Sequence, residues 1–233
     1  MKKNLLPILT LACLLMSAAP AILAQSSAKN ETQEGAPLSR RVSGRTLISK
    51  ESPAARITFD KNFKYVGGQS FVLYGVANAE QHFFVDADKQ GRIKRLYWVQ
   101  FEGYLPANTH TYNYKSPLIT NVDGYDFFAD AYPRNIPANR AHQRPDSDGS
   151  RAQAFLESKG LRMAGDDVIM QRLVHMTDKT NRSELMFIYI EDLSGTGLTA
   201  ADLSEKGSAA ARWQAMSKEL LARAVKGIRI SRQ

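Results

Sequence analysis

The sequence predicts an α+β domain in which an antiparallel β-sheet packs against a C-terminal α-helix. Residues 56–104 are rich in β-branched and aromatic side chains and contain short polar turns, which is typical of an antiparallel meander. Residues 168–176 and 185–191 have the pattern of a second strand pair. Near the C-terminus, apolar side chains recur at helical spacing. We therefore expect a single globular domain over residues 55–233, with a long aromatic and proline-rich loop within it.

The first residues have the pattern of a secretory signal peptide. Lys2 and Lys3 precede an apolar run over residues 5–15, and small residues follow this run. This order predicts a signal peptide over residues 1–24 and an exported protein, periplasmic or extracellular. Two alternatives are an uncleaved membrane anchor, for which the run is short, and a lipoprotein acylated at Cys13. Cys13 is the single cysteine, so cleavage after residue 24 leaves a domain without disulfides.

Residues 25–54 are predicted to form a flexible leader. They contain few large apolar side chains and cannot bury enough surface to fold by themselves. Within this segment, residues 42–48 have the composition of a short edge strand or of a helical turn, and the sequence does not decide between the two.

The meander is predicted from apolar alternation and from turns that contain glycine. Gly67 and Gly68 are expected to form a turn, and residues 71–76, which are apolar on both faces, are expected to form an interior strand. Residues 88–91 (Asp-Lys-Gln-Gly) form the next expected turn. The predicted strands are residues 56–60, 63–66, 71–76, 82–87 and 93–101.

Residues 105–149 are predicted to be a long loop with one helical turn near residues 124–132. Prolines at short intervals disfavour a regular interior element. A loop of this length is typical of a lid or a binding loop, and the sequence leaves open whether it is a lid or a packed connection. The prolines are Pro106, Pro117, Pro133, Pro137 and Pro145.

Two helices are predicted after this loop. The first covers residues 150–159, with Ser150 as its N-cap and Gly160 at its end. The second is a C-terminal helical region that begins near Thr199 and is broken or kinked at Gly207. Its apolar face, which we expect to lie across the sheet, consists of Trp213, Met216, Leu220, Leu221 and Ala224.

One candidate site is the polar cluster of Glu80, His82 and Asp86. On an extended strand these side chains project from one face, as does Asp88, and an imidazole flanked by carboxylates can bind a divalent metal or act as a general base. The alternative is a solvated outer face of the sheet, which is the more common arrangement. The spacing does not match a calcium loop, because the position that requires glutamate holds Tyr97.

A second candidate site, for ligand binding, consists of His110, Tyr112 and Tyr114 in the predicted loop. Aromatic rings with polar tips beside a histidine are suited to hold a sugar, a flat ligand or a haem. The alternative is that these rings fasten the loop to the domain, because their burial offsets the entropy lost when the loop becomes ordered.

Composition and motifs limit the possible classes of function. The chain carries a formal charge of +8, and the part after residue 24 has 29 basic and 23 acidic residues, a net charge of +6. The basic residues are dispersed, so we expect only weak contact with anionic surfaces and no nucleic-acid partner. No apolar stretch after residue 24 is long enough to span a bilayer. Motifs of common hydrolases, metalloproteases and nucleotide-binding sites are absent, and we predict neither a metal nor a cofactor.

These observations favour a non-enzymatic binding or accessory module. Its expected ligand is a small apolar or amphipathic molecule or an envelope component, because large apolar and aromatic groups gather around a long loop. The alternative is a hydrolase that uses His82 or His110 in metal-assisted or general-base catalysis. A second alternative is a structural protein that interacts with a partner in the envelope.

Overall fold

The computed structural model describes residues 37–116 and 118–233. The predicted signal peptide and residues 25–36 of the predicted leader lie outside these ranges. The described chain forms two β-sheets, in which nearly all pairs are antiparallel, and three helices. This confirms the α+β class.

The larger sheet has the strand order β4-β5-β6-β11-β10-β8-β7, and the short β9 pairs with β6 in parallel. Because β11 pairs with β6, the predicted meander and the predicted second strand pair belong to one sheet. Its strands are β4 (Lys64–Leu73), β5 (Ala77–Ala87), β6 (Arg92–Tyr104), β7 (Leu118–Val122), β8 (Tyr125–Asn135), β9 (Arg162–Met163), β10 (Asp167–Met176) and β11 (Ser183–Asp192).

The smaller sheet has the order β1-β2-β3-β12. The end of the predicted flexible leader forms β1 (Arg41–Ser43) and β2 (Thr46–Ser49), which confirms the strand alternative for residues 42–48 and corrects the prediction that the leader is flexible up to residue 54. This segment becomes ordered because β2 pairs with β3 (Ala55–Phe59), which allows Leu47 to be fully buried. The sequence also did not predict β12 (Ile228–Arg232), which follows the last helix and pairs with β3.

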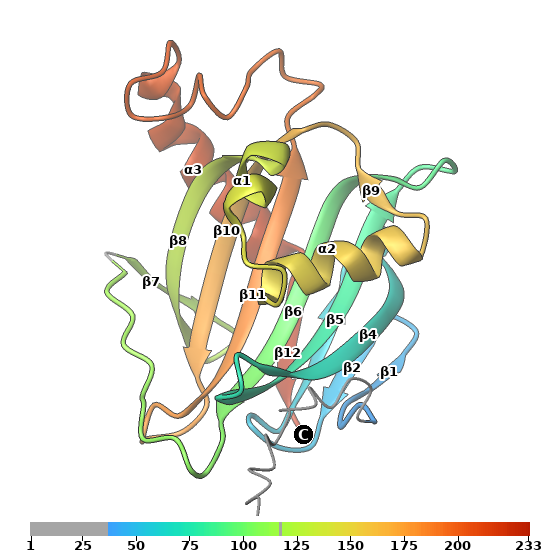
Figure 1. Ribbon diagram of the computed structural model, residues 1–233, viewed down its shortest axis with the longest axis vertical. Helices are drawn as coiled ribbons and strands as arrows, with labels where there is room; N and C mark the ends of the chain where they lie inside the picture. The colour runs from blue at the N-terminus through green and yellow to red at the C-terminus, as the bar shows by residue number, and fades with distance from the viewer. Residues whose placement is uncertain (1–36, 117) are drawn as a thin grey trace, which may run out of the picture. The chain divides into compact units, whose positions relative to one another are not determined.

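The helices lie on opposite faces of the larger sheet. In Figure 1, α1 (Ile136–His142) and α2 (Asp148–Ser158) lie on the near side of the sheet, and α3 (Ala210–Lys226) lies behind it. The predicted apolar face of α3 is confirmed, because Leu220 and Ala224 are buried in the core and the other three residues pack against it. The sheet therefore separates two apolar cores.

Each core combines one face of the larger sheet with a helix. On the α2 side, Phe83, Trp98 and Ile188 join Leu156 of α2. The core on the α3 side contains the buried aromatic residues of the opposite face together with apolar residues of the smaller sheet. It includes Phe59, Phe84, Tyr97, Phe127, Phe187 and Tyr189.

Gly67 and Gly68 lie inside β4 and do not form the predicted turn. The register of β4 against β5 shifts between Tyr65 and Gly67, which is a β-bulge. Gly67 has a φ of +125°, and a Cβ atom there would lie 2.8 Å from the ring of Phe155 in α2. A glycine is therefore required both by the backbone conformation and by the close approach of α2.

The predicted interior strand over residues 71–76 is also wrong. β4 ends at Leu73 and lies at an edge of the larger sheet. The chain turns at Tyr74 and Gly75, whose φ angles are +51° and +72°. This segment is apolar on both faces, but among the described strands β4 pairs with β5 alone and therefore lies at the edge.

Much of the predicted loop over residues 105–149 is regular structure. β7 and β8 form a hairpin through Asp123 and Gly124, whose φ angles of +51° and +90° fit a two-residue turn. Pro133 lies in β8 beyond the β7 pairing, where a proline removes no ladder hydrogen bond to a described strand. Apart from the hairpin turn, the described irregular residues within the predicted loop are 105–116, between β6 and β7, and 143–147, between α1 and α2.

The predictions of the helix after this loop and of the strand pair that follows it are confirmed, but the predicted N-cap of the helix is wrong. The cap of α2 is Ser147, whose hydroxyl accepts a hydrogen bond from the Ser150 amide, so the helix begins at Asp148. Gly160 follows the helix with a φ of +71°. β10 and β11 match the predicted strand pair.

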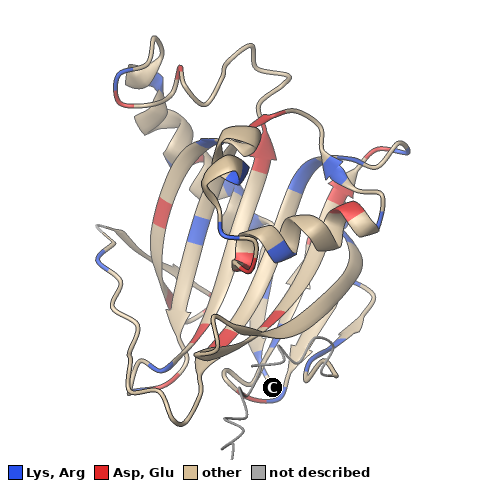
Figure 2. Cartoon of the chain, in the orientation of Figure 1, with Lys and Arg blue, Asp and Glu red and all other residues tan. Residues whose placement is uncertain are grey.

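No helix in the described part of the chain is both long and apolar enough to cross a membrane. Figure 2 shows basic and acidic segments interspersed on the strands and helices in view. This distribution agrees with the dispersed charge of the sequence.

Candidate functional site

Two of the three predicted polar cluster residues meet in the structure. His82 is fully buried, and its Nε2 lies 2.8 Å from Oε1 of Glu80. The other ring nitrogen, Nδ1, lies 3.1 Å from the Tyr65 hydroxyl. If Tyr65 donates to Nδ1 and the Nε2–H group donates to Glu80, all three polar groups are satisfied. Burial and the charge of Glu80 raise the pKa of Tyr65 to about 12, so its hydroxyl keeps the proton that this arrangement needs.

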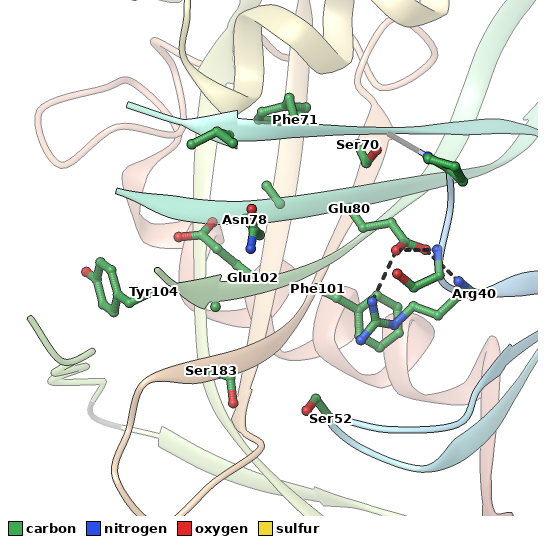
Figure 3. Close-up of a pocket in the computed structure, with 15 residues that line it drawn as sticks. Arg40, Ser52, Ser70, Phe71, Asn78, Glu80, Phe101, Glu102, Tyr104 and Ser183 are labelled. Atoms are coloured by element: carbon green, nitrogen blue, oxygen red, sulfur yellow. Dashed lines mark hydrogen bonds and ion pairs between the residues drawn. The ribbon is translucent and has the colours of Figure 1, made fainter. Parts of the chain in front are cut away.

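Glu80 also holds the first described segment of the chain. Its carboxylate accepts hydrogen bonds from the backbone amides of Ser39 and Arg40 at 2.9 and 3.0 Å, and from the Arg40 guanidinium at 3.2 Å. Figure 3 shows these contacts beside Phe101, over whose ring the guanidinium lies at 3.8 Å. Burial acts to raise the pKa of Glu80, but hydrogen bonds from His82 and Ser39 and the charge of Arg40 lower it to about 2.

The third predicted cluster residue, Asp86, lies apart from this pair. Its carboxylate forms an ion pair with Arg95 at 2.6 Å, and Asp88 forms one with Arg92 at 2.7 Å. The contacts of Glu80 with His82 on one side and with the N-terminal segment on the other fasten this segment to the sheet. The imidazole of His82, which also contacts Tyr65, has no surface open to a substrate.

The second predicted site places two tyrosines over two carboxyl groups of the sheet, of which Glu184 is buried and Glu102 is half-buried. The Tyr112 hydroxyl donates to Glu102 at 2.7 Å, and the Tyr114 hydroxyl donates to Glu184 at 2.8 Å. His110 is exposed, and its ring centroid lies 6.1 Å from that of Tyr104. Hydrogen bonds to the sheet hold both tyrosines, so this geometry favours the fastening role over the lid role.

Glu102 and Glu184 are direct neighbours on β6 and β11. Burial raises the pKa of Glu102. Burial, followed by the nearby charge of Glu102, raises the pKa of Glu184 to about 8. Glu184 therefore retains its proton near neutral pH, which avoids two adjacent buried negative charges.

A chain of amide side chains connects Glu102 to α2. The Gln100 amide donates to Glu102 at 2.6 Å, and Gln81 donates to the Gln100 side chain at 2.8 Å. Gln81 also donates to the carbonyl of Asp148, the first residue of α2, at 3.1 Å. These bonds fix the N-terminal end of α2 above the sheet.

Beside this network, α1 and α2 cover a cavity of about 510 Å³ on the larger sheet. Its floor is apolar and comes from β6, β10 and β11, and its roof comes from α1, α2 and the segment that leads to β10. The apolar floor residues are Leu96, Trp98, Val168, Met170, Met186, Ile188 and Ile190.

Charged residues surround this apolar floor. The cavity is lined by four arginines (Arg134, Arg140, Arg162 and Arg172) and by three acidic residues (Asp148, Glu157 and Asp166). Arg140 pairs with Glu157 at 3.0 Å. Burial raises the pKa of Asp148, which disfavours its negative charge. The lining therefore combines an apolar centre with a balance of charge that favours an anion over a cation.

Other hollows are less suited to a ligand. One of about 680 Å³ is lined largely by charged groups that already pair with one another, such as Arg223 with Glu191 at 2.8 Å. Another, of about 440 Å³, lies beside the Glu80 and Arg40 contacts (Figure 3). Within the described residues, no group of three histidine, cysteine or acidic side chains could hold a metal ion.

The cavity under α1 and α2 was not predicted from the sequence. Its floor residues were assigned to strands and most of α2 to a helix, but α1, which completes the roof, comes from residues that were predicted to be a loop. One local signal could have revealed this: Asp123-Gly124 between two apolar-containing segments is a strong indication of a hairpin, which shortens the loop and leaves residues 136–142 free to form a helix.

The chain has no significant similarity to a known protein family, to a curated protein or to a solved structure.

Proposed function

We propose that this protein is a non-enzymatic binding module for one small apolar or amphipathic ligand, held in the cavity between the larger sheet and α1 and α2. The observation that carries this proposal is the cavity itself, with a volume of about 510 Å³ and an apolar floor. Ligand sites in proteins are commonly concave, mostly apolar and about 300–1,000 Å³ in volume, with a few polar groups at defined places.

We further propose that the module acts outside the cytoplasm. The pattern of residues 1–24, with lysines before a short apolar run and small residues after it, supports export. A ligand for this compartment would be an amphipathic molecule of the envelope or its surroundings.

The hydrolase alternative has less support. His82 is fully buried and engaged through both ring nitrogens. His110 is exposed and lies outside the residues that line the cavity. Neither histidine faces a site where a substrate and a water molecule could meet.

One observation favours protein interaction as a second candidate function. β7 is an edge strand, and its Leu118 and Ile119 are 46% and 60% exposed. Exposed apolar side chains on a free strand edge are suited to contact another chain.

Occlusion of the cavity tests the binding proposal. Ala152 is on the buried side of α2 and lines the cavity, whereas Ala154 is on the exposed side of the same helix. We expect Ala152→Phe to reduce the affinity for the apolar fluorophore N-phenyl-1-naphthylamine at least tenfold, because the new ring occupies the site. Ala154→Phe is the matched control and should leave the affinity unchanged.

The affinity of each variant for the fluorophore is measured by fluorescence titration, and thermal melts confirm that both variants are folded. Equal affinities for both folded variants, or no binding by the wild type, would refute the binding proposal.

A further inference from the structure

Two buried N–H groups on residues that line this cavity have no hydrogen-bond partner within the described chain. They are Nε1 of Trp98 and Nε of Arg172. Trp98 is only 6% exposed. A buried donor without an acceptor loses its hydrogen bonds to water without replacement, so such groups in a native protein require an explanation.

The two donors lie on the same row of the sheet. Trp98 pairs with Ile188 on β11, and Ile188 pairs with Arg172 on β10. Side chains paired in this way project from the same face, and two strand spacings separate Trp98 and Arg172 by roughly 10 Å at the backbone. Both side chains are long enough to approach a group placed above Ile188.

Arg172 is held in a fixed position. Its Nη2 donates to Asp130 at 2.9 Å, and its guanidinium lies 5.2 Å from the ring centre of Tyr114. These contacts use one edge and one face of the guanidinium and leave Nε without a partner. A guanidinium that already has these contacts loses little further entropy when it binds an acceptor.

The adjacent row of the floor is apolar. Leu96, Ile190 and Met170 are paired in register across β6, β11 and β10. Leu156 of α2 lines the opposite wall. An acceptor placed over Ile188 can therefore be continuous with an apolar body that lies between the sheet and α2.

We infer that the ligand is an amphipathic carboxylate, with its carboxylate above Ile188 as the acceptor for Trp98 Nε1 and Arg172 Nε, and with its apolar body on Leu96, Met170 and Ile190. This inference rests on the proposed binding function. A carboxylate is favoured over an amine, because both unpartnered groups are donors and Arg172 is a cation.

The test compares head groups on one chain length. Decanoate, methyl decanoate and decylamine are titrated against the wild-type protein as competitors of N-phenyl-1-naphthylamine. We expect decanoate to bind about tenfold or more tightly than decylamine, since a hydrogen bond to a charged group contributes on the order of a tenfold change in affinity.

Two variants then test the positions of the donors. Trp98→Phe keeps an aromatic ring but removes the N–H group, and Arg172→Lys keeps a cation for Asp130 but removes Nε. Each should weaken decanoate about tenfold more than it weakens N-phenyl-1-naphthylamine. Arg56→Gln, at an exposed arginine of β3 outside the cavity lining, is the control and should leave the preference for decanoate intact.

The outcomes separate the two proposals. If the fluorophore does not bind, the binding function itself fails. If the fluorophore binds but the wild type does not prefer decanoate, the carboxylate inference is overturned while the binding function stands. A preference for decanoate that persists in both Trp98→Phe and Arg172→Lys would place the head group elsewhere and also overturn the carboxylate inference. If Trp98→Phe does not fold, the carboxylate inference is still tested by the head-group preference of the wild type and by its loss in Arg172→Lys.

Discussion

Replacement of Glu184 by glutamine should remove a pH-dependent loss of stability. Glu184 is 2% exposed, lies next to Glu102 on the adjoining strand and accepts a hydrogen bond from Tyr114. Burial and the charge of Glu102 raise its pKa from 4.5 to about 8. A glutamine can still accept the Tyr114 hydrogen bond through its carbonyl oxygen, but it carries no charge at any pH.

The direction of the effect follows from the raised pKa. In the unfolded chain this carboxyl loses its proton near pH 4.5, whereas the folded protein retains the proton up to about pH 8. Between these values the folded state binds more protons, so the free energy of unfolding falls as the pH rises, and it becomes constant again above pH 8.

The magnitude follows from the size of the shift. A rise from 4.5 to about 8 corresponds to roughly 5 kcal/mol at 1.36 kcal/mol per unit. We expect Glu184→Gln to gain about 2–4 kcal/mol relative to the wild type between pH 5 and pH 9, because the folded protein relaxes around the new charge and offsets part of this energy.

Urea unfolding, followed by tryptophan fluorescence at pH values from 5 to 9, measures this difference. Glu205→Gln, at an exposed carboxyl, is the matched control and should follow the wild-type curve. A wild-type stability that stays constant or rises over this range relative to Glu184→Gln would refute the assignment of a raised pKa to this carboxyl.

Two further predictions concern stability. Glu80→Gln should lower the free energy of unfolding by about 3 kcal/mol at pH 7, because the carboxylate that binds Ser39, Arg40 and His82 has a pKa lowered to about 2. This stabilisation is complete above pH 4.5 and disappears as the pH falls to about 2. Urea unfolding that shows the same loss of stability at pH 2 and at pH 7 would contradict this prediction. Ile230→Ala in β12 should lower the free energy of unfolding by about 2–5 kcal/mol, because Ile230 is only 5% exposed and belongs to the core. The control is Arg229→Ala, at an exposed neighbour. If both variants change the free energy of unfolding equally little, β12 is not part of the folded core.

Elements with a strong local pattern could be predicted from the sequence. The apolar face of α3, the α2 helix with its terminal Gly160 and the β10–β11 pair all match the structure closely. In each, the periodicity and the end signals lie within about twenty neighbouring residues, so no knowledge of distant partners is needed. The same local reasoning placed Glu80 and His82 on one face of a strand, since residues two apart on a strand share a face, and the structure shows that their side chains are hydrogen-bonded.

Other features depended on partners that are distant in sequence. β2 and β12 are short strands that become stable only through β3, and β11 joins the meander only because it pairs with β6. The local sequence around Gly67 is typical of a turn. In the structure this glycine instead lies in a β-bulge that allows α2 to approach the sheet closely.

The candidate site was likewise decided by tertiary structure. Trp98 and Arg172 are separated by many residues in the sequence, and they meet over one cavity only because β6 and β10 both flank β11. Pairing energies between distant strands fix this arrangement, whereas the sequence pattern records only which face of each strand is apolar.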